Sequence, residues 1–589
     1  MKVSLKNPNL KYYRTWEWVT GFILMAGCYL YFRYVTPYHV CFKEQILLFV
    51  FRSSYILSYF SKPAAVACLG GDFLTQFFYF KTGGAVVITL LLVVEWGLVR
   101  LTLKRFAAGK WHVAALLPVM VEWVAFPHFS FAVSLSVSFI LALATFLFYT
   151  KLNRKIAFIT GLVLIPFLYM IAGASVFLFV FLVTLYERKR KVSVLIAITC
   201  AIPFLFRYYY LLTLQQAYLY PYPDIMQALS LVTMAVLVLL SKYIFIYMPL
   251  ARRTFAVIIV VSLWIIALVK TTDRNQENLF GMMTEAYHNR WDNVLEIAGK
   301  AELKTPIAAH YVNIALSQKN LLGDRLMDFY QPFSSGLLLS VTPGTGWLDI
   351  FSSSDGFFHI GDMEMAQHAA LVGMLFSPFQ RSARLVERLA EINLITGDWP
   401  VATKYIRMLN ATLFHRIDFV RGSDFIAGGN DFVAGGNDFI AGGIGGSGVR
   451  RAIFREDVIR KSIDHKVSLE LLVASNPDNM PAVNYLLCYH LLNKDIPAFF
   501  KAYTSYYKGT IQPAPKVYAQ ALLIYFAVLQ SPVEELMAYD ISPEIIRQFS
   551  EYTRLYETVE GQLAPVQKQY PKSYWLYYHF AVANNDINN

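Results

Sequence analysis

The stretch Phe255–Val269 (FAVIIVVSLWIIALV) decides how the chain is organised, because the character of the sequence changes across it. Upstream lie long apolar runs separated by short basic loops, and downstream, from Lys270 onward, the sequence is polar. We interpret the stretch as the last of a series of membrane spans. The sequence therefore predicts an all-α protein, with a transmembrane domain at residues 1–270 and a water-soluble helical domain at residues 271–589.

The charge of the chain is divided between these two parts. Residues 1–270 hold 25 Lys and Arg against 7 Asp and Glu, whereas residues 271–589 hold 27 against 33. Basic residues in short loops mark the cytoplasmic side of a membrane protein. The basic excess is therefore a topology signal, and we expect no nucleic-acid partner. The five cysteines show no metal-ligand spacing, so we expect neither a metal site nor a cofactor.

The apolar runs predict about nine spans when every basic cluster is placed in the cytoplasm. The N-terminus is then cytoplasmic, and the C-terminal domain lies outside the cytoplasm, in the periplasm if the membrane is the inner membrane of a Gram-negative bacterium. The parity of this count rests on Ile156–Tyr186, which is too long for one span and is predicted to be a hairpin that turns near Gly173. The other spans are Trp18–Thr36, Gly84–Leu103, His112–Phe126, Phe131–Tyr149, Val192–Leu212, Asp224–Tyr247 and Phe255–Val269.

The segment at residues 37–83 is apolar but interrupted by charged residues and by Lys62-Pro63 and Gly70-Gly71. Each piece is too short to span a membrane. We expect amphipathic or re-entrant helices at the outer surface, with membrane lipids as neighbours.

The C-terminal half shows paired helical patterns about a dozen residues long, which are typical of an α-solenoid. The clearest unit is Ala383–Leu413, with a turn at Gly397-Asp398-Trp399, and it resembles a tetratricopeptide repeat. Asn476–Tyr507 and Met282–Ala301 are further units, with turns at Lys494-Asp495 and Arg290-Trp291-Asp292. Generic helical packing is the alternative explanation of these patterns.

Two stretches interrupt the paired helices. Residues 333–362 are rich in Ser and Gly (PFSSG, TPGTG, SSSDG) and predict a long loop. The insert at residues 421–450 contains three heptads at 424–444, DFIAGGN, DFVAGGN and DFIAGGI. Two glycines in each heptad disfavour a helix by about 1 kcal/mol apiece, so we expect a loosely turned or disordered insert rather than a metal or partner site.

Two carboxylates lie within the predicted spans, each in a Val-Glu-Trp triplet: Glu95 and Glu122. An ionised carboxylate at that depth is costly unless it is paired or wetted, so such residues are functional candidates. For Glu95 we expect structural pairing with Arg100 or with a neighbouring span. Glu122 lies near the outer end of its span, below His128, and is a candidate substrate contact.

The predicted topology also places Arg33, Glu44, Asp72 and Arg207 on the outer side. A carboxylate just after the first span resembles the GT-C glycosyltransferases, which take sugars from polyprenyl-phosphate carriers. That resemblance implies Glu44 (in FKEQ) as catalytic base, Asp72 as second acid, and Arg33, Arg52 or Arg207 as phosphate contacts. An outward-facing cavity lined by Glu44, Glu122, His128 and Arg207 would favour this activity. The alternative is that Glu44 and Asp72 are solvated charges on helices that lie at the membrane interface.

A second resemblance covers almost the whole chain. GDFLTQFFYF, RLAEINLITGDWPVATKYIRMLNATLFHR and YPKSYWLYYHF resemble an uncharacterised family of bacterial polytopic proteins with periplasmic tetratricopeptide-like C-termini. The resemblance implies the architecture and no activity. Three functions stay open: an envelope assembly protein whose helical domain binds a periplasmic protein or peptide, a transferase for a lipid-linked sugar, and a transporter.

Overall fold

The computed structural model describes residues 8–106, 113–128, 130–187, 192–224, 226–243, 250–342, 344–416, 464–508, 513–530, 536 and 538–581. Within these ranges the protein is helical and contains no strand, which confirms the predicted all-α class. The predicted insert at 421–450 lies outside the described residues.

The structure divides into two compact units. Unit 1 comprises residues 1–277 together with 410–416, and unit 2 comprises residues 278–409 and 417–589. The chain therefore enters unit 2, returns to unit 1 for seven residues after Leu409, and continues in unit 2.

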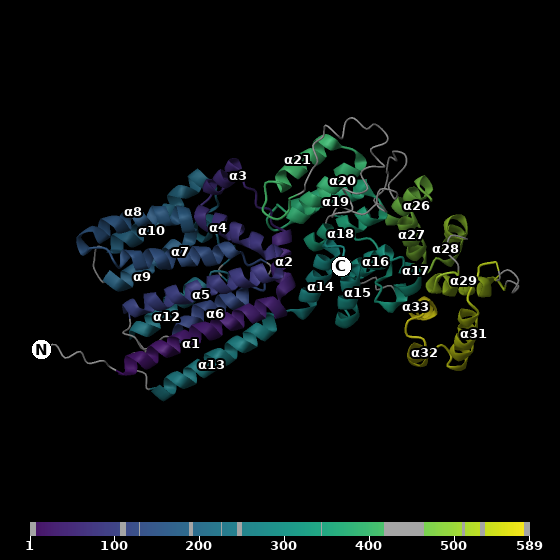
Figure 1. Ribbon diagram of the computed structural model, residues 1–589, viewed down its shortest axis with the longest axis horizontal. Coiled ribbons are helices and arrows are strands. Elements are labelled where there is room, and N and C mark those ends of the chain that lie inside the picture. Colours follow the sequence, from purple (N-terminus) through teal and green to yellow (C-terminus); the bar gives the residue numbers. More distant parts are fainter. Residues whose placement is uncertain are drawn as a thin grey trace. The chain divides into compact units, whose positions relative to one another are not determined.

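Unit 1 contains the apolar helices (Figure 1). They are α1 (Pro8–Leu30), α2 (Pro37–Gln45), α3 (Ser53–Ser58), α4 (Ala65–Thr75), α5 (Lys81–Phe106), α6 (Leu116–Ala125), α7 (Val133–Tyr149), α8 (Arg154–Ala172), α9 (Val176–Glu187), α10 (Val192–Tyr210), α11 (Leu214–Leu219), α12 (Leu229–Tyr243) and α13 (Leu250–Thr271).

By length and composition, three apolar segments of the described residues are able to cross a membrane: Lys81–Phe106, Ile156–Glu187 and Val192–Tyr210. Val19–Val35 with Pro37–Gln45, bent by 73°, would be a fourth. Pro37 explains this bend, because its ring cannot continue the preceding helix. Several other predicted spans are helical but shorter, such as α6 and α7. The count of about nine crossings stays a prediction.

The predicted hairpin near Gly173 is present. Gly173 has a φ of +63°, in the left-handed region that glycine favours. Ser138 Oγ of α7 lies 2.6 Å from Ser175 Oγ at this turn, and at the other end of α7 the rings of Phe146 and Tyr186 are 6.1 Å apart. Helix α9 therefore runs along α7 in the direction opposite to α8.

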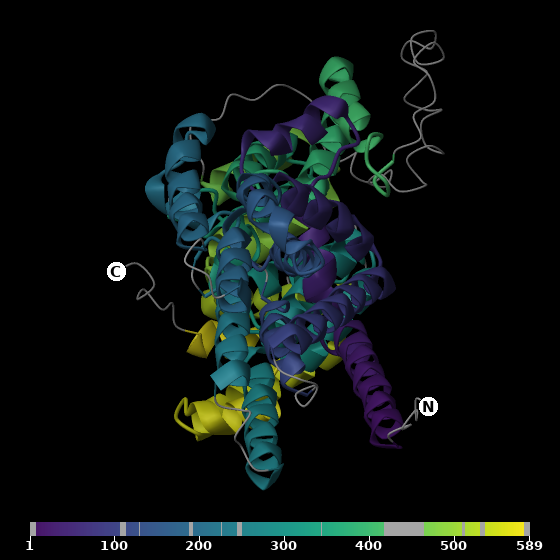
Figure 2. The same cartoon turned by 90° about the vertical axis from the view of Figure 1, so that its left-hand side faces the viewer.

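The segment at residues 37–83 forms short helices, as predicted, but α4 is packed into the unit. A Cβ at Gly71 of α4 would lie 2.3 Å from the backbone nitrogen of Ser134, so α4 and α7 approach at backbone distance. Apolar side chains on the outer faces of the long helices remain exposed, among them Ile159, Val163, Ile258 and Leu263. Figure 2 shows α1 in purple and α13 in teal as separate long helices of this unit. These faces agree with a lipid environment.

Unit 2 consists of paired helices. They are α14 (Arg274–Tyr287, which begins in unit 1), α15 (Trp291–Ala301), α16 (Pro306–Gln318), α17 (Leu322–Arg325), α18 (Trp347–Ile360), α19 (Met363–Phe376), α20 (Ala383–Thr396), α21 (Trp399–Leu409), α26 (His465–Ser475), α27 (Met480–Leu492), α28 (Ile496–Ala502), α29 (Lys516–Leu529), α31 (Pro543–Thr558), α32 (Leu563–Gln569) and α33 (Tyr574–Phe580). The predicted pairs correspond to α14–α15, α20–α21 and α27–α28, and Gly397 ends α20 with a φ of +83°.

The predicted loop at residues 333–362 is wrong over its second half, which forms α18. Ser352, Ser353 and Ser354 are buried in this helix. A Cβ at Gly356 would lie 2.2 Å from His310 Cε1 of α16. The small residues that suggested a loop therefore permit close packing of α18 against its neighbours.

Candidate functional site

Helix α2 carries buried polar side chains in its first and last turns and contacts three distant parts of unit 1. His39, Lys43 and Glu44 are only 3–5% exposed. Pro37 begins the helix, and His39 and Lys43 lie one turn apart on the same face. Buried charges and imidazoles require partners, so these three residues show what holds unit 1 together at this point.

Glu44, the predicted catalytic base, is paired with His415. Glu44 Oε1 lies 2.6 Å from His415 Nε2, and His415 is 8% exposed. The backbone of the 410–416 segment also joins unit 1, since Phe51 N–H donates to Ala411 O at 2.7 Å. Phe414 stacks on Tyr79 with ring centroids 5.5 Å apart. Glu44 is thus enclosed by a segment that returns to unit 1 from far along the chain.

Lys43 and His39 complete the connections of α2. Lys43 Nζ donates to the carbonyl oxygens of Phe126 and Phe131, at 2.6 and 2.9 Å. The Glu277 carboxylate lies at the N-terminal end of α2, where it accepts from the backbone N–H groups of Tyr38 and His39 and contacts His39 Nδ1 at 2.5 Å. A carboxylate at a helix N-terminus is favoured by the helix dipole. Residues of α2 therefore hold the α6–α7 turn and the start of α14.

The other predicted site residues have partners of their own. Asp72 Oδ2 accepts from Tyr59 Oη at 2.6 Å. His128, in the α6–α7 turn held by Lys43, contacts Ser130 Oγ through Nδ1 at 2.7 Å. The predicted phosphate contacts lie at or near the surface: Arg33 over the ring of Tyr34, Arg52 exposed before α3, and Arg207 against Phe204 and Tyr208.

Glu122 interacts with Glu95 rather than with an outer-side group. Both carboxyls are fully buried, Glu95 on α5 and Glu122 on α6, and they lie within electrostatic range of each other. Ser136 Oγ of α7 donates to Glu122 Oε2. The expected pairing of Glu95 with a neighbouring span stays a prediction, and Arg100 lies over the ring of Trp96, with its guanidinium carbon 5.6 Å from the centroid.

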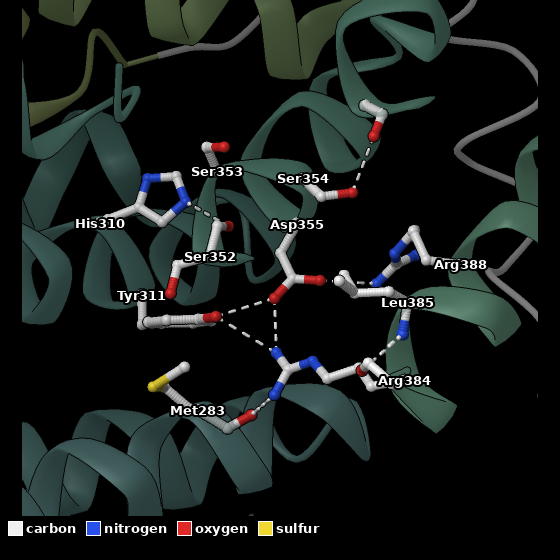
Figure 3. A network of polar contacts seen from close by, with 12 residues as sticks. Met283, His310, Tyr311, Ser352, Ser353, Ser354, Asp355, Arg384, Leu385 and Arg388 are labelled. Carbon is white, nitrogen blue, oxygen red and sulfur yellow. Dashed lines mark hydrogen bonds and ion pairs between the residues drawn. The ribbon is translucent and has the colours of Figure 1, made fainter. Parts of the chain in front are cut away.

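Sequence reasoning missed a buried ion network in unit 2, which Figure 3 shows from close by. Asp355 of α18 forms ion pairs with Arg384 and Arg388 of α20, the second at 3.0 Å. Tyr311 Oη donates to Asp355 Oδ2 at 2.8 Å, and Arg384 Nη1 donates to Met283 O at 2.9 Å. The network joins α14, α16, α18 and α20. The signal in the sequence was the spacing of Arg384 and Arg388, which are four residues apart and therefore lie on the same face of α20.

Burial and charge set the protonation of this network. Burial raises the pKa of Asp355, but the guanidinium groups of Arg384 and Arg388 outweigh it and hold the pKa well below its usual range. Burial, and then the positive charge of Arg388, lower the pKa of His359 to about 3. Burial raises the pKa of Glu391 to about 7 although Arg388 Nη1 lies 2.7 Å from its carboxylate. The network therefore contains one firmly ionised carboxylate and a neutral imidazole.

Comparison with protein families gives one match, which covers almost the whole chain. A family described as a family of unknown function, DUF6057, matches residues 11–581. The chain belongs to this family. The match covers residues of both units. No curated protein and no solved structure matches the chain.

Among the hollows in the described part of unit 2 of this DUF6057 chain, two are lined by polar side chains. One, of about 380 Å³, has basic and acidic side chains in its wall, among them Lys304, Arg325 and Asp328. The other, of about 440 Å³, is lined by hydroxyl groups, by Leu338 and Leu339, and by Asp349, Asp464, His465 and Tyr489. In the part of the chain that the structure describes, no group of three or more His, Cys, Asp or Glu side chains is arranged to hold a metal ion.

Proposed function

We propose that this protein is an integral membrane protein that binds a partner protein through its C-terminal helical unit, as an envelope assembly or interaction protein. In this proposal unit 1 crosses the inner membrane about nine times, and unit 2, a tetratricopeptide-like helical domain, lies in the periplasm. The observation that carries the proposal is the 440 Å³ hollow of unit 2, which we call the hydroxyl groove.

The chemistry of the hydroxyl groove suits a peptide segment. Leucine side chains offer apolar contact, and hydroxyl groups offer hydrogen bonds to a peptide backbone; the hydroxyls are those of Ser334, Ser335, Ser340, Thr345 and Tyr489. Among the described residues, Asp349 and Asp464 are the charged groups of the lining, and it contains no lysine or arginine. Burial lowers the pKa of His465, so this imidazole is neutral at physiological pH. The groove thus favours a segment that carries a Lys or Arg side chain.

Site-specific photo-crosslinking in the native host tests the proposal. A photoreactive amino acid at Ser335 or Tyr489 is expected to give a discrete crosslinked product, and Lys300, an exposed residue outside the groove lining, serves as the control position. The double variant D349K/D464K is expected to abolish the product at normal protein level. A product of equal yield at all positions, or one that persists in the double variant, contradicts the proposal.

The placement of unit 2 needs a separate test. A C-terminal reporter that works only in the cytosol is expected to be inactive. An active reporter would put unit 2 in the cytoplasm and would remove a periplasmic partner.

A lipid-linked sugar transferase is the second candidate, and the Glu44–His415 pair favours it, because a carboxylate beside an imidazole is a common general-base arrangement. The same contact argues against it, since both groups are closed off from substrate. The double variant E44Q/D72N decides the matter. Loss of cellular function at a normal membrane level, with the crosslinked product retained, would favour the transferase, whereas unchanged function favours the interaction protein.

A further inference from the structure

The carboxyl groups of Glu95 and Glu122 are buried in unit 1 within interaction range of each other. Glu95 is 0% and Glu122 1% exposed, and they come from different helices, α5 and α6. In the described part of the chain neither forms an ion pair with a basic side chain. Two negative charges so close together in an apolar interior would repel each other without compensation.

The hydrogen-bond inventory of the pair lacks donors. An ionised carboxylate only accepts hydrogen bonds. Among the described residues, no group donates a hydrogen bond to either oxygen of Glu95 or to Oε1 of Glu122. Ser136 Oγ donates a hydrogen bond to Glu122 Oε2. A hydrogen bond between the two carboxyls satisfies these atoms only if one carboxyl carries a proton.

A hydroxyl group from a third helix completes the arrangement. Ser230 of α12 is 2% exposed, and its Oγ has no hydrogen-bond partner of its own. It lies within interaction range of the Glu122 carboxyl. Four helices, α5, α6, α7 and α12, therefore each direct one oxygen-bearing side chain to the same buried point.

We propose that Glu95 and Glu122 share one proton and, with Ser136 and Ser230, form a proton-binding site inside unit 1. The site is independent of the proposed partner binding by unit 2. The ligand is a proton rather than a metal ion, because a single shared proton leaves one negative charge that the two serine hydroxyls are able to solvate.

A row of hydroxyl groups lies beside the site. Tyr222 Oη is 3.0 Å from Ser175 Oγ, which is 2.6 Å from Ser138 Oγ, and Tyr222 is within electrostatic range of both glutamates. Tyr222 is buried, but Asp224, two residues further along the chain, is exposed. In the proposal Tyr222 is the group through which the buried proton exchanges with the surface.

Infrared spectroscopy of the full-length protein in lipid nanodiscs tests the shared proton. At neutral pH the wild type is expected to show the carbonyl band of a buried protonated carboxyl, which shifts in D₂O. The double variant E95Q/E122Q is expected to lose this band, because glutamine keeps the shape of glutamic acid but has no acidic proton. Both proteins carry E391Q as well, because Glu391, with its pKa raised to about 7, would add a second buried carboxyl band. The variant E44Q, which changes a buried glutamate of α2, is the matched control and is expected to keep it.

The outcomes separate the proposal from its alternatives. A wild-type spectrum equal to that of E95Q/E122Q would show that both carboxyls are ionised and would overturn the proposal. Loss of the band on addition of sodium ions would overturn it as well, since the site would then hold a cation. In Y222F the band is expected to remain but its shift in D₂O to be slowed, and an unchanged rate would overturn the role of Tyr222.

Discussion

Asp355 of unit 2 and the Glu95–Glu122 pair of unit 1 are buried carboxyl groups that are stabilised by opposite means. In unit 2, Asp355 receives two guanidinium groups and a tyrosine hydroxyl. In unit 1, Glu95 and Glu122 lie within electrostatic range of each other, and Ser136 Oγ donates a hydrogen bond to Glu122. An ionised group needs compensating charge in a dry interior, whereas a protonated one needs only hydrogen bonds.

The difference shows how each unit uses its buried polar residues. Asp355 fixes the relative positions of α18 and α20, and the arginines in turn reach α14 and α16. Its role is structural, because all of its partners come from the protein itself. The glutamate pair is incompletely satisfied by the protein and is completed by a proton. Groups that lack a full set of partners are the ones expected to exchange a ligand.

The largest effect is expected for D355N. Asparagine keeps the shape of aspartate but leaves the buried guanidinium groups of Arg384 and Arg388 without a counter-charge, so the free energy of unfolding of unit 2 should fall by about 3–5 kcal/mol. Hydrogen exchange of α18 and α20 in the full chain measures the loss. D292N is the control, because the pair of Asp292 with Lys319 lies at the surface and should contribute less than about 1 kcal/mol. Equal losses in both variants would contradict a structural role for Asp355.

The next effect is expected where helices touch through glycine. In G71A the new methyl group would meet the backbone of Ser134, which cannot rotate away, and in G356A it would meet the ring of His310. His310 is itself held by Leu337 O, 2.7 Å from its Nδ1. Each substitution should lower the free energy of unfolding by about 1–3 kcal/mol, with G71A at the upper end.

Two glycines with open surroundings serve as controls for these variants. No atom lies within 4 Å of a Cβ at Gly97 in α5 or at Gly299 in α15. There G97A and G299A should be neutral or stabilising by about 0.5–1 kcal/mol, since alanine favours helix. Thermal unfolding of all four variants provides the measurement, and losses in the controls would show that helix propensity is not the governing factor.

The helices were predictable because their signals are local. The period of apolar residues, Gly173 at the hairpin and Gly397 after α20 lie within the elements that they define. Helix α18 was missed because serine and glycine disfavour a helix by intrinsic propensity, and their benefit appears only once α16 is packed against them. Tertiary packing overrode the local preference in that segment.

The candidate sites were predictable in residue type and not in partner. The cost of burying charge singled out Glu95 and Glu122, and both are buried, but nothing in the sequence pairs α5 with α6. Glu44 is buried as well, and its partner His415 is 371 positions away. The sequence pattern assigned the residues before His415 to a helical repeat, whereas the structure places 410–416 in unit 1. Such long-range pairs follow from topology, which periodicity does not contain.

A smaller effect is expected in the pH dependence of unit 2. His359, with its pKa lowered from 6.5 to about 3, stabilises the fold fully above pH 6.5, and this contribution is lost as the pH falls. Glu391, with its pKa raised from 4.5 to about 7, acts in the opposite direction, because its contribution is lost as the pH rises from 4.5 to 7. The two effects oppose each other in the wild type between pH 6.5 and pH 4.5.

The variant E391Q should reveal the histidine contribution alone. Relative to the wild type, its free energy of unfolding should fall on acidification below pH 6.5 with an added slope of about 1.4 kcal/mol per pH unit, the value for one proton. Denaturant unfolding at several pH values measures the slope. The double variant H359Q/E391Q should remove it, and a slope that survives in the double variant would assign the proton to another group.

The smallest effect, and the sharpest test of the comparison, is expected for E95Q. If one proton is shared between Glu95 and Glu122, glutamine at residue 95 supplies the same kind of donor without leaving a charge unpaired, and the free energy of unfolding should change by about 1 kcal/mol or less. Thermal unfolding in lipid nanodiscs, measured beside D355N, checks this. A loss as large as that of D355N would mean that Glu95 is an ionised partner of some cation, and the two units would then stabilise buried carboxyls in the same way. A small loss would show that replacing a carboxyl by an amide lowers the free energy of unfolding strongly in D355N, where buried arginines pair with the carboxylate, and only weakly in E95Q.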